Sequence, residues 1–237
     1  MTELLYLTDS YLREFTATVT EADADGVVLD RTAFYPQGGG QQSDTGLLLD
    51  DAGHEYAVKR VRRVKGRVVH AIDVELPQAG ATLRGVIDWV RRYKLMRTHT
   101  ALHILCGVIW RDYGASVTGG NMEPLKARMD FELESMSSAF SDEVEAKINA
   151  EVAAARPVRI DILPREEAFQ IPDLIRTKIN LLPESIQEVR VVEIEGLDLQ
   201  ADGGTHVANT KEVGRIRVTG HESKGRINKR LRIEIEE

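Results

Sequence analysis

The pattern of apolar and polar positions changes character near residue 88. Before it, short apolar runs alternate with polar residues and are separated by turn residues about every ten positions, which is typical of a small barrel or curled sheet. The predicted strands cover residues 15–19, 26–29, 46–49, 56–61, 68–72 and 82–87. We therefore predict an N-terminal β-barrel-like domain over residues 1–88, which also carries a glycine-rich motif.

A helical period replaces this pattern directly after Asp88. The Asp88 carboxylate can accept a hydrogen bond from the first turn and so begin a helix. Apolar positions then recur at helical spacing up to Trp110, which predicts one apolar face. That face comprises Leu95, His99, Leu102, His103, Cys106, Ile109 and Trp110.

The remainder of the chain mixes one more helix with further strands. Phe140, Val144, Ile148 and Val152 recur every four residues and Pro157 follows, which predicts a second helix. Gly119 and Gly120 indicate a turn. The predicted strands cover residues 126–133, 158–163, 188–194, 213–218 and 231–235. Residues 89–237 thus form a predicted α+β domain, with helices packed on a mainly antiparallel sheet.

Composition fits a globular protein of one large or two modest domains. The chain has 237 residues, of which 42% are hydrophobic and 29% are charged. It contains no apolar run of about 18 residues, and its start lacks a basic segment followed by an apolar one. We expect a cytoplasmic protein without a membrane partner. Its one cysteine, Cys106, lies on the apolar face and is expected in the core.

The net charge of −7 argues against non-specific affinity for nucleic acid, but the basic residues are clustered. Each cluster alone is typical of a solvated face. Three clusters converging on one place would instead form a track for phosphate groups. The clusters are Lys59, Arg60, Arg62, Arg63, Lys65 and Arg67; Arg91, Arg92, Lys94 and Arg97; and Lys224, Arg226, Lys229, Arg230 and Arg232.

Two pairs of potential ligands share a spacing of four residues. His99 and His103 would lie on one face of the first helix, with Cβ atoms about 5–6 Å apart. Asp202 and His206 flank a Gly-Gly-Thr bend far along the chain. The alternative is a pair of hydrogen-bonded core histidines, but a buried polar group without a partner costs about 1–3 kcal/mol. Because one ion would satisfy all four side chains, the spacing predicts a split metal site.

A glycine-rich segment, residues 35–44, carries three consecutive glycines at Gly38, Gly39 and Gly40. Glycine lets the backbone approach a ligand closely and adopt positive φ. The alternative is a plain hairpin turn, which does not explain the neighbouring Gln37, Gln41 and Gln42. The segment lacks the Gly-Lys-Ser/Thr ending of a phosphate-binding loop, so we do not expect nucleotide hydrolysis.

Taken in order, these motifs carry a family resemblance. The residues are Thr32-Ala-Phe-Tyr-Pro-Gln-Gly-Gly-Gly-Gln-Gln-Ser-Asp44, Asp88-Trp, Arg92-Tyr, Met96-Arg-Thr-His-Thr-Ala-Leu-His103 and Asp198-Leu-Gln-Ala-Asp-Gly-Gly-Thr-His-Val207. They resemble the editing domain of alanyl-tRNA synthetases and its free-standing relatives, the AlaX proteins. The chain is too short to hold an activation domain as well, so it is similar to the free-standing form that keeps the barrel-like domain.

The resemblance implies trans-editing, the hydrolysis of the ester that joins serine or glycine to alanine tRNA. A second sieve is needed because a hydrophobic pocket rejects an added hydroxyl only about 10²-fold. The implied cofactor is one Zn²⁺ per chain, held by His99, His103, Asp202 and His206. It would anchor the substrate's amino group or lower the pKa of an attacking water. The choice between serine and glycine and the oligomeric state stay open.

One ligand departs from the family pattern. The family usually has cysteine where this chain has Asp202. A carboxylate also binds zinc, at about 2.0–2.2 Å, so Asp202 would make a site with harder ligands. In the alternative, three histidines bind the metal and Asp202 orients water.

Other roles follow from the same resemblance. Gln41 would position water or the ester, and Thr32 would recognise the serine hydroxyl; without the resemblance, Thr32 is an ordinary strand threonine. The amides of Gly38, Gly39 and Gly40 would steady the oxyanion. The expected substrate-binding set is completed by Thr205, Arg92 and Arg97.

Two other functions remain open. A non-catalytic tRNA-binding module would hold the metal as a structural ion, since four filled protein positions are typical of structural zinc. A metallohydrolase for small esters or amides would have no need of basic clusters.

Overall fold

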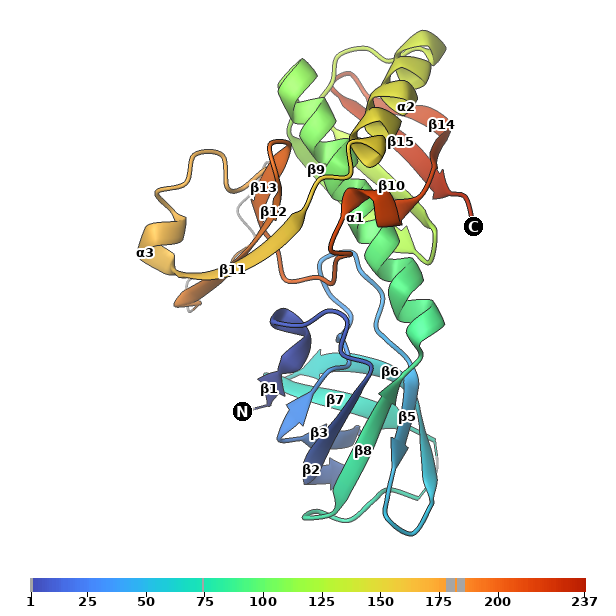
Figure 1. Cartoon of the computed structure of the whole chain (residues 1–237), viewed down its shortest axis with the longest axis vertical. Coiled ribbons are helices and arrows are strands. Elements are labelled where there is room, and N and C mark those ends of the chain that lie inside the picture. The colour runs from blue at the N-terminus through green and yellow to red at the C-terminus, as the bar shows by residue number, and fades with distance from the viewer. Residues whose placement is uncertain (1, 74, 178–181, 183–185) are drawn as a thin grey trace. The chain divides into compact units, whose positions relative to one another are not determined.

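The computed structural model describes residues 2–73, 75–177, 182 and 186–237 (Figure 1). The chain divides into two compact units, Met1–Leu95 and Met96–Glu237. Helix α1 (Trp89–Tyr113) begins in the first unit and continues into the second. The domain boundary at residue 88 stays a prediction from the change in sequence pattern.

The N-terminal unit is a closed antiparallel barrel with strand order β2-β3-β7-β6-β5-β8. Its strands are β2 (Glu14–Asp23), β3 (Gly26–Leu29), β5 (Gly46–Leu49), β6 (Glu55–Val64), β7 (Arg67–Ile72) and β8 (Thr82–Ile87). All six predicted strands are therefore confirmed. Outside the barrel, β1 (Glu3–Leu4) leads into a short 3-10 turn, η1 (Leu5–Leu7), and pairs in parallel with β4 (Arg31–Thr32).

Apolar side chains from alternate positions fill the barrel, as period-two patterning requires. Phe15, Val19, Leu29, Leu48 and Leu83 are among its buried core residues. Gly85 lies opposite Phe15 in the β2–β8 pair, and a Cβ at Gly85 would come within 2.3 Å of the Phe15 ring. The missing side chain at Gly85 thus makes room for the aromatic ring of Phe15.

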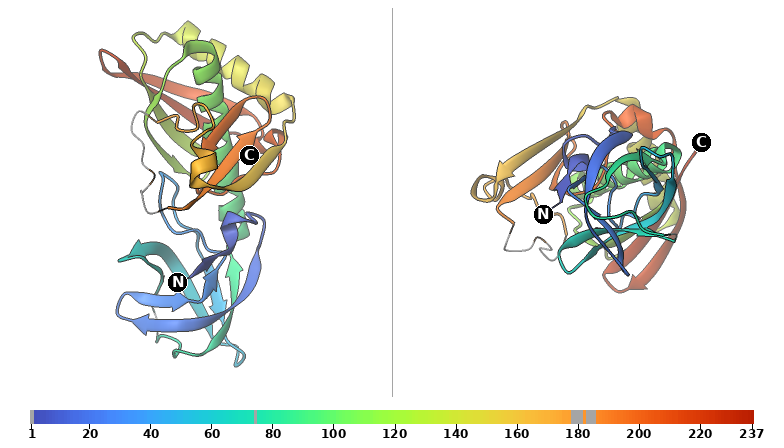
Figure 2. Two further views of the ribbon diagram at one scale, coloured as in Figure 1. Left: turned by 90° about the vertical axis from the view of Figure 1, so that its left-hand side faces the viewer. Right: turned by 90° about the horizontal axis from the view of Figure 1, so that it is seen from below.

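The C-terminal unit places α1 between two antiparallel sheets (Figures 1 and 2). One sheet has the order β14-β15-β10-β9 and the other β11-β12-β13. Their strands are β9 (Val117–Glu123), β10 (Lys126–Phe131), β11 (Val158–Pro164), β12 (Glu188–Ile194), β13 (Asp198–Ala201), β14 (Ile216–Gly225) and β15 (Asn228–Ile235). The predicted α+β class is confirmed.

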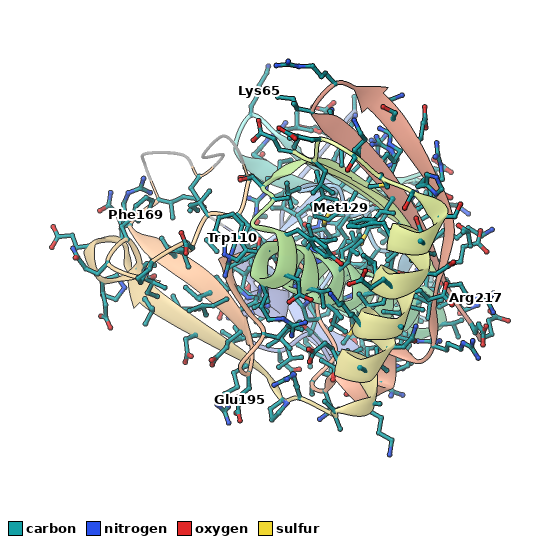
Figure 3. The ribbon with its side chains drawn as sticks, turned by 90° about the horizontal axis from the view of Figure 1, so that it is seen from above. Lys65, Trp110, Met129, Phe169, Glu195 and Arg217 are labelled. Atoms are coloured by element: carbon teal, nitrogen blue, oxygen red, sulfur yellow. The ribbon has the colours of Figure 1, made fainter. Side chains whose placement is uncertain are left out.

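The described part of this unit also contains two further helices and a 3-10 turn, η2 (Thr210–Val213). Helix α2 (Ser138–Ala153) begins after Ser137, whose hydroxyl accepts the Phe140 N–H. The short α3 (Arg165–Ala168) follows β11. Phe169 comes directly after α3 and lies at the outer edge of this unit (Figure 3). Within the described ranges, no helix combines the length and apolar character needed to cross a membrane.

The middle of helix α1 is buried on every side. The Asp88 Oδ1 atom accepts the Arg91 N–H at 3.1 Å, which confirms the predicted cap. From Thr98 to Ile109, however, every residue is buried. The predicted stripe is therefore buried, and the other sides of this stretch are buried as well because it lies between two sheets.

The glycine pair at 119–120 is also corrected. Gly119 and Gly120 lie inside β9, opposite Asp130 and Met129 of β10. The turn between these strands comes later, where Leu125 adopts a φ of 63°. Strand β13 was not predicted, although it leads directly to Asp202.

Candidate functional site

Four side chains that are distant in sequence meet beside α1. His99 and His103 come from consecutive turns of this helix, while Asp202 and His206 come from the loop that follows β13. One potential ligand atom from each residue lies within 4.8 Å of all the others. Three of the four residues are buried and Asp202 is half-buried.

The Asp202 carboxylate faces all three imidazoles. Its Oδ1 lies 3.5 Å from His99 Nε2 and 4.0 Å from His103 Nε2, while its Oδ2 lies 3.0 Å from His206 Nε2. A tetrahedral zinc ion with bonds of about 2.0–2.1 Å separates its ligand atoms by about 3.3 Å. The donor set therefore has the composition and nearly the spacing that zinc requires.

The protonation states of these side chains also suit the binding of a cation. Burial lowers the pKa of His99 to about 4, and burial together with His99 holds the pKa of His206 well below its usual range. Burial alone would raise the pKa of Asp202, but the neighbouring histidines outweigh it and hold that pKa well below its ordinary value. At neutral pH the cluster thus offers two neutral imidazoles and an ionised carboxylate, which are the forms that bind metal.

Hydrogen bonds orient two of the imidazoles. His103 Nδ1 lies 2.9 Å from Asp198 Oδ2, and His206 Nδ1 lies 3.2 Å from Thr100 Oγ1. Burial opposes protonation of His103, but the hydrogen bond and charge of Asp198 outweigh it and raise the His103 pKa. In both residues Nδ1 is engaged on the side away from the cluster, so Nε2 is the atom presented to an ion.

The loop that carries Asp202 is fixed from β12. Arg190 Nη1 donates to the backbone oxygen of Asp202 at 2.9 Å and lies 3.7 Å from its Oδ2. The Gly204 N–H donates to Asp202 Oδ2 at 2.6 Å. Thr205, between the ligands, is fully buried. Arg190 was not predicted as part of the site, because it lies in a strand whose other features indicate only a core.

Thr32 occupies a different environment from the one expected of a hydroxyl sensor. His70 Nδ1 lies 3.0 Å from the Val27 carbonyl, which can only accept, and burial lowers the His70 pKa to about 4. His70 Nε2 therefore accepts the Thr32 hydroxyl proton at 2.9 Å, and Thr32 Oγ1 accepts the Phe34 N–H at 3.1 Å. Because its hydroxyl proton is already donated and none of its surface is exposed, we assign Thr32 a structural role.

The glycine-rich segment forms a tight hairpin in the N-terminal unit. Gly38 and Gln41 exchange backbone hydrogen bonds of 3.1 and 2.8 Å. Gly39 and Gly40 between them have φ values of 55° and 83°, the sign that a primed two-residue turn needs and that favours glycine. Residues 38–40 are exposed, whereas the Gln41 side chain is buried.

The two arginines expected to bind substrate are both engaged within their own units. The Arg92 guanidinium is fully buried and binds the Asp44 carboxylate, the Ser10 carbonyl and the Ala33 carbonyl. It has no surface to offer tRNA, so we assign it a structural role. Arg97 is half-buried and donates to the carbonyls of Val213 and Glu236 at 2.9 and 2.7 Å.

Cys106 is buried, as expected of a core residue. Burial raises the pKa of its thiol, which keeps the thiol protonated and unreactive.

Comparison with known proteins identifies the family of this chain. Residues 4–91 match the class II (A) tRNA synthetases, and residues 189–232 match the threonyl and alanyl tRNA synthetase second additional domain. The chain is 42% identical to alanyl-tRNA editing protein AlaX-M of Saccharolobus solfataricus, over 98% of both chains. It belongs to the AlaX-M family of alanyl-tRNA editing proteins. The AlaX-M protein of Methanosarcina barkeri is 41% identical over the same share of both chains.

The AlaX-M family is related in turn to part of a larger enzyme. The chain is 41% identical to alanine–tRNA ligase of Thermofilum pendens over 93% of its own length, but covers only 24% of that ligase. The resemblance to the editing domain inferred from the sequence motifs is thereby confirmed.

Proposed function

We propose that this protein is a trans-editing hydrolase that removes serine or glycine from mischarged alanine tRNA in a zinc-dependent reaction. The observation that carries the proposal is the meeting of His99, His103, Asp202 and His206 in a chain whose AlaX-M relatives are named alanyl-tRNA editing proteins. Those names support an aminoacyl ester as the bond that is broken.

His99, His103, Asp202 and His206 would hold the one zinc ion. When bound, zinc supplies Lewis acidity near the scissile ester. Asp202 would ligate in the position that the family gives to cysteine, because its carboxylate is ionised and faces all three imidazoles. Two of these imidazoles already present Nε2 to the cluster, so little reorganisation is needed for binding.

Gln41 would position the ester or the attacking water by hydrogen bonding. Its backbone is fixed by two hydrogen bonds to Gly38, and its side chain is held in a buried position. The exposed tip at residues 38–40 would let the tRNA 3′ end approach the backbone closely and would offer amide donors to the oxyanion. Thr205, buried between two ligands of the second unit, would shape the pocket around the metal.

The basic residues that would contact tRNA phosphates are those without a carboxylate partner. In the C-terminal cluster, Arg230 binds Asp130 at 2.6 Å and Arg232 binds Glu222 at 2.9 Å, so much of its charge is balanced. On β6 and the turn after it, the exposed residues Lys59, Arg60, Arg63 and Lys65 form no ion pair within the described part of the chain. We therefore assign the phosphate track mainly to this first cluster.

Deacylation of seryl-, glycyl- and alanyl-tRNA by the purified protein tests the proposal. We expect hydrolysis of the serine or glycine ester at a rate well above that of the alanine ester. Gln41→Ala should lower the rate by about 10²-fold, the usual effect of losing one positioning or oxyanion group. Gln78→Ala, which alters an exposed glutamine of the same unit, should leave it unchanged. Tight tRNA binding without hydrolysis of any ester would favour the binding-module function.

A further inference from the structure

One face of α1 is approached unusually closely by the chain between β12 and β13. A Cβ atom at Gly107 would lie 2.9 Å from Leu197 Cγ, 3.0 Å from the Leu197 carbonyl oxygen and 3.1 Å from Asp198 Cβ. Such distances require a shift of the neighbouring backbone or of Gly107 itself. Glycine in a helix interior normally weakens the helix relative to alanine, so this one must be explained by the approach it allows.

That approach brings Asp198 to a metal ligand. Gly107 lies one turn after His103 on the same face of α1, and Trp110 lies almost one turn further along. Asp198 is the first residue of β13, paired with Ile194 of β12. Its Oδ2 lies 2.9 Å from His103 Nδ1 and is fully shielded from solvent.

Two further side chains hold the Asp198 carboxylate. Gln200, on the same face of β13, donates from Nε2 to Asp198 Oδ2 at 2.7 Å. Arg176 Nε lies 4.0 Å from Asp198 Oδ1, and the Arg176 guanidinium packs over the Trp110 ring at 4.6 Å. Trp110 lies towards the C-terminal end of α1 (Figure 3). A buried carboxylate is costly unless it is balanced, and Arg176 supplies the opposite charge.

We propose that Asp198 is a positioning residue for the metal ligand His103, and that Gly107 is the position in α1 that allows Asp198 to reach it. The carboxylate accepts the Nδ1–H of His103, which fixes the tautomer and turns the Nε2 lone pair towards His99, Asp202 and His206. Its negative charge strengthens the imidazole as a donor to zinc. The inference rests on the proposed function for its catalytic relevance, but it makes a claim about metal binding that needs no tRNA.

The affinity for Zn²⁺, measured by competition with a chromophoric chelator on the full chain, tests this inference. Loss of an outer hydrogen-bond partner of a metal-binding histidine typically lowers metal affinity by about 10–100-fold. We expect that loss for Asp198→Ala, a smaller one for Asp198→Asn, which keeps an acceptor without the charge, and a loss of about tenfold for Gly107→Ala. Gly220→Ala, at a glycine with nothing within 4 Å of a built Cβ, should leave zinc affinity unchanged.

A purely structural role predicts a different pattern. Glu151 is another buried carboxylate, bound to Arg111 and Arg156 away from the site, so Glu151→Gln should lower the free energy of unfolding without changing zinc affinity. Wild-type zinc affinity in folded Asp198→Asn and Asp198→Ala would overturn the inference. If either variant does not fold, Gly107→Ala provides the test. A zinc affinity and a Co²⁺ absorption spectrum equal to those of the wild type in Gly107→Ala would overturn the inference. If the variants bind zinc more weakly but the wild-type protein deacylates none of the tRNAs, this inference is supported and the proposed function is refuted.

Discussion

Removal of the Arg92 side chain should destabilise the N-terminal unit and leave tRNA contacts untouched. Arg92 was expected from the sequence to bind substrate, whereas in the structure its guanidinium and the Asp44 carboxylate are both 0% exposed. Arg92 Nε lies 2.9 and 3.0 Å from the two Asp44 oxygens, and Nη1 donates to the Ser10 carbonyl at 3.0 Å. The Asp44 carboxylate also accepts the Tyr35 N–H at 2.6 Å and so closes the glycine-rich segment.

The size of the effect follows from what remains after the substitution. Arg92→Met leaves a buried carboxylate without its counter-charge, which typically costs about 3–5 kcal/mol. Arg92→Met combined with Asp44→Leu removes both charges and should recover much of that loss, leaving about 1–2 kcal/mol for the hydrogen bonds to Tyr35, Ser10 and other carbonyls.

Urea denaturation measures these free energies. Trp89 lies in the N-terminal unit, stacked on Tyr93 with ring centroids 5.6 Å apart, so its fluorescence in a Trp110→Phe background reports on that unit. A loss below about 1 kcal/mol for Arg92→Met, together with weaker tRNA binding, would refute the structural role and restore the one predicted from sequence.

Three other predictions follow from the two units. Burial holds the His70 pKa at about 4, so as pH falls below 6.5 the unfolded chain takes up a proton that the folded chain excludes at this position. The His70 contribution to stability should fall by up to about 3 kcal/mol between pH 6.5 and 4, and in urea denaturation His70→Phe should remove that part of the slope while leaving the parts due to the buried His99 and His206. Asp202→Ala should lower zinc affinity at least tenfold by chelator competition and Asp202→Cys should preserve it, whereas equal affinity in Asp202→Ala would mean that Asp202 does not ligate. Arg60→Ala should weaken tRNA binding and reduce the slope of log K against log salt by about one, whereas Arg67→Ala, which removes a residue already bound to Glu21 and Asp23, should change the slope little and so serve as its control.

The strands of the barrel could be predicted because each has one buried face. Alternation along β2 and β8 reports that face directly, and turn residues separate the runs. Strand β13 was missed because its inward positions are Asp198 and Gln200, which serve a polar site and break the expected apolar pattern. The alternation of these residues with Leu199 and Ala201 was the available signal.

The ligand set was predictable, whereas the surroundings of the ligands were not. Helical spacing places His99 and His103 on one face, and the glycines between Asp202 and His206 allow a bend. Nothing in the spacing shows that Asp198 reaches His103 or that Arg190 holds the Asp202 loop, because these contacts join segments about 95 and 12 residues apart. The burial of Arg92 was equally hidden, since an arginine near a helix start is usually exposed.

The most direct test of the account is the rate of seryl-tRNA deacylation as a function of bound metal. The protein is stripped with a chelator, dialysed, and assayed on alanine tRNA carrying serine while Zn²⁺ is added back in steps. We predict a rate at least tenfold lower in the metal-free protein, recovering fully at about one zinc ion per chain, and no recovery in His99→Ala. Full activity in the metal-free protein would contradict the central claim that the His99, His103, Asp202 and His206 cluster is a catalytic zinc site.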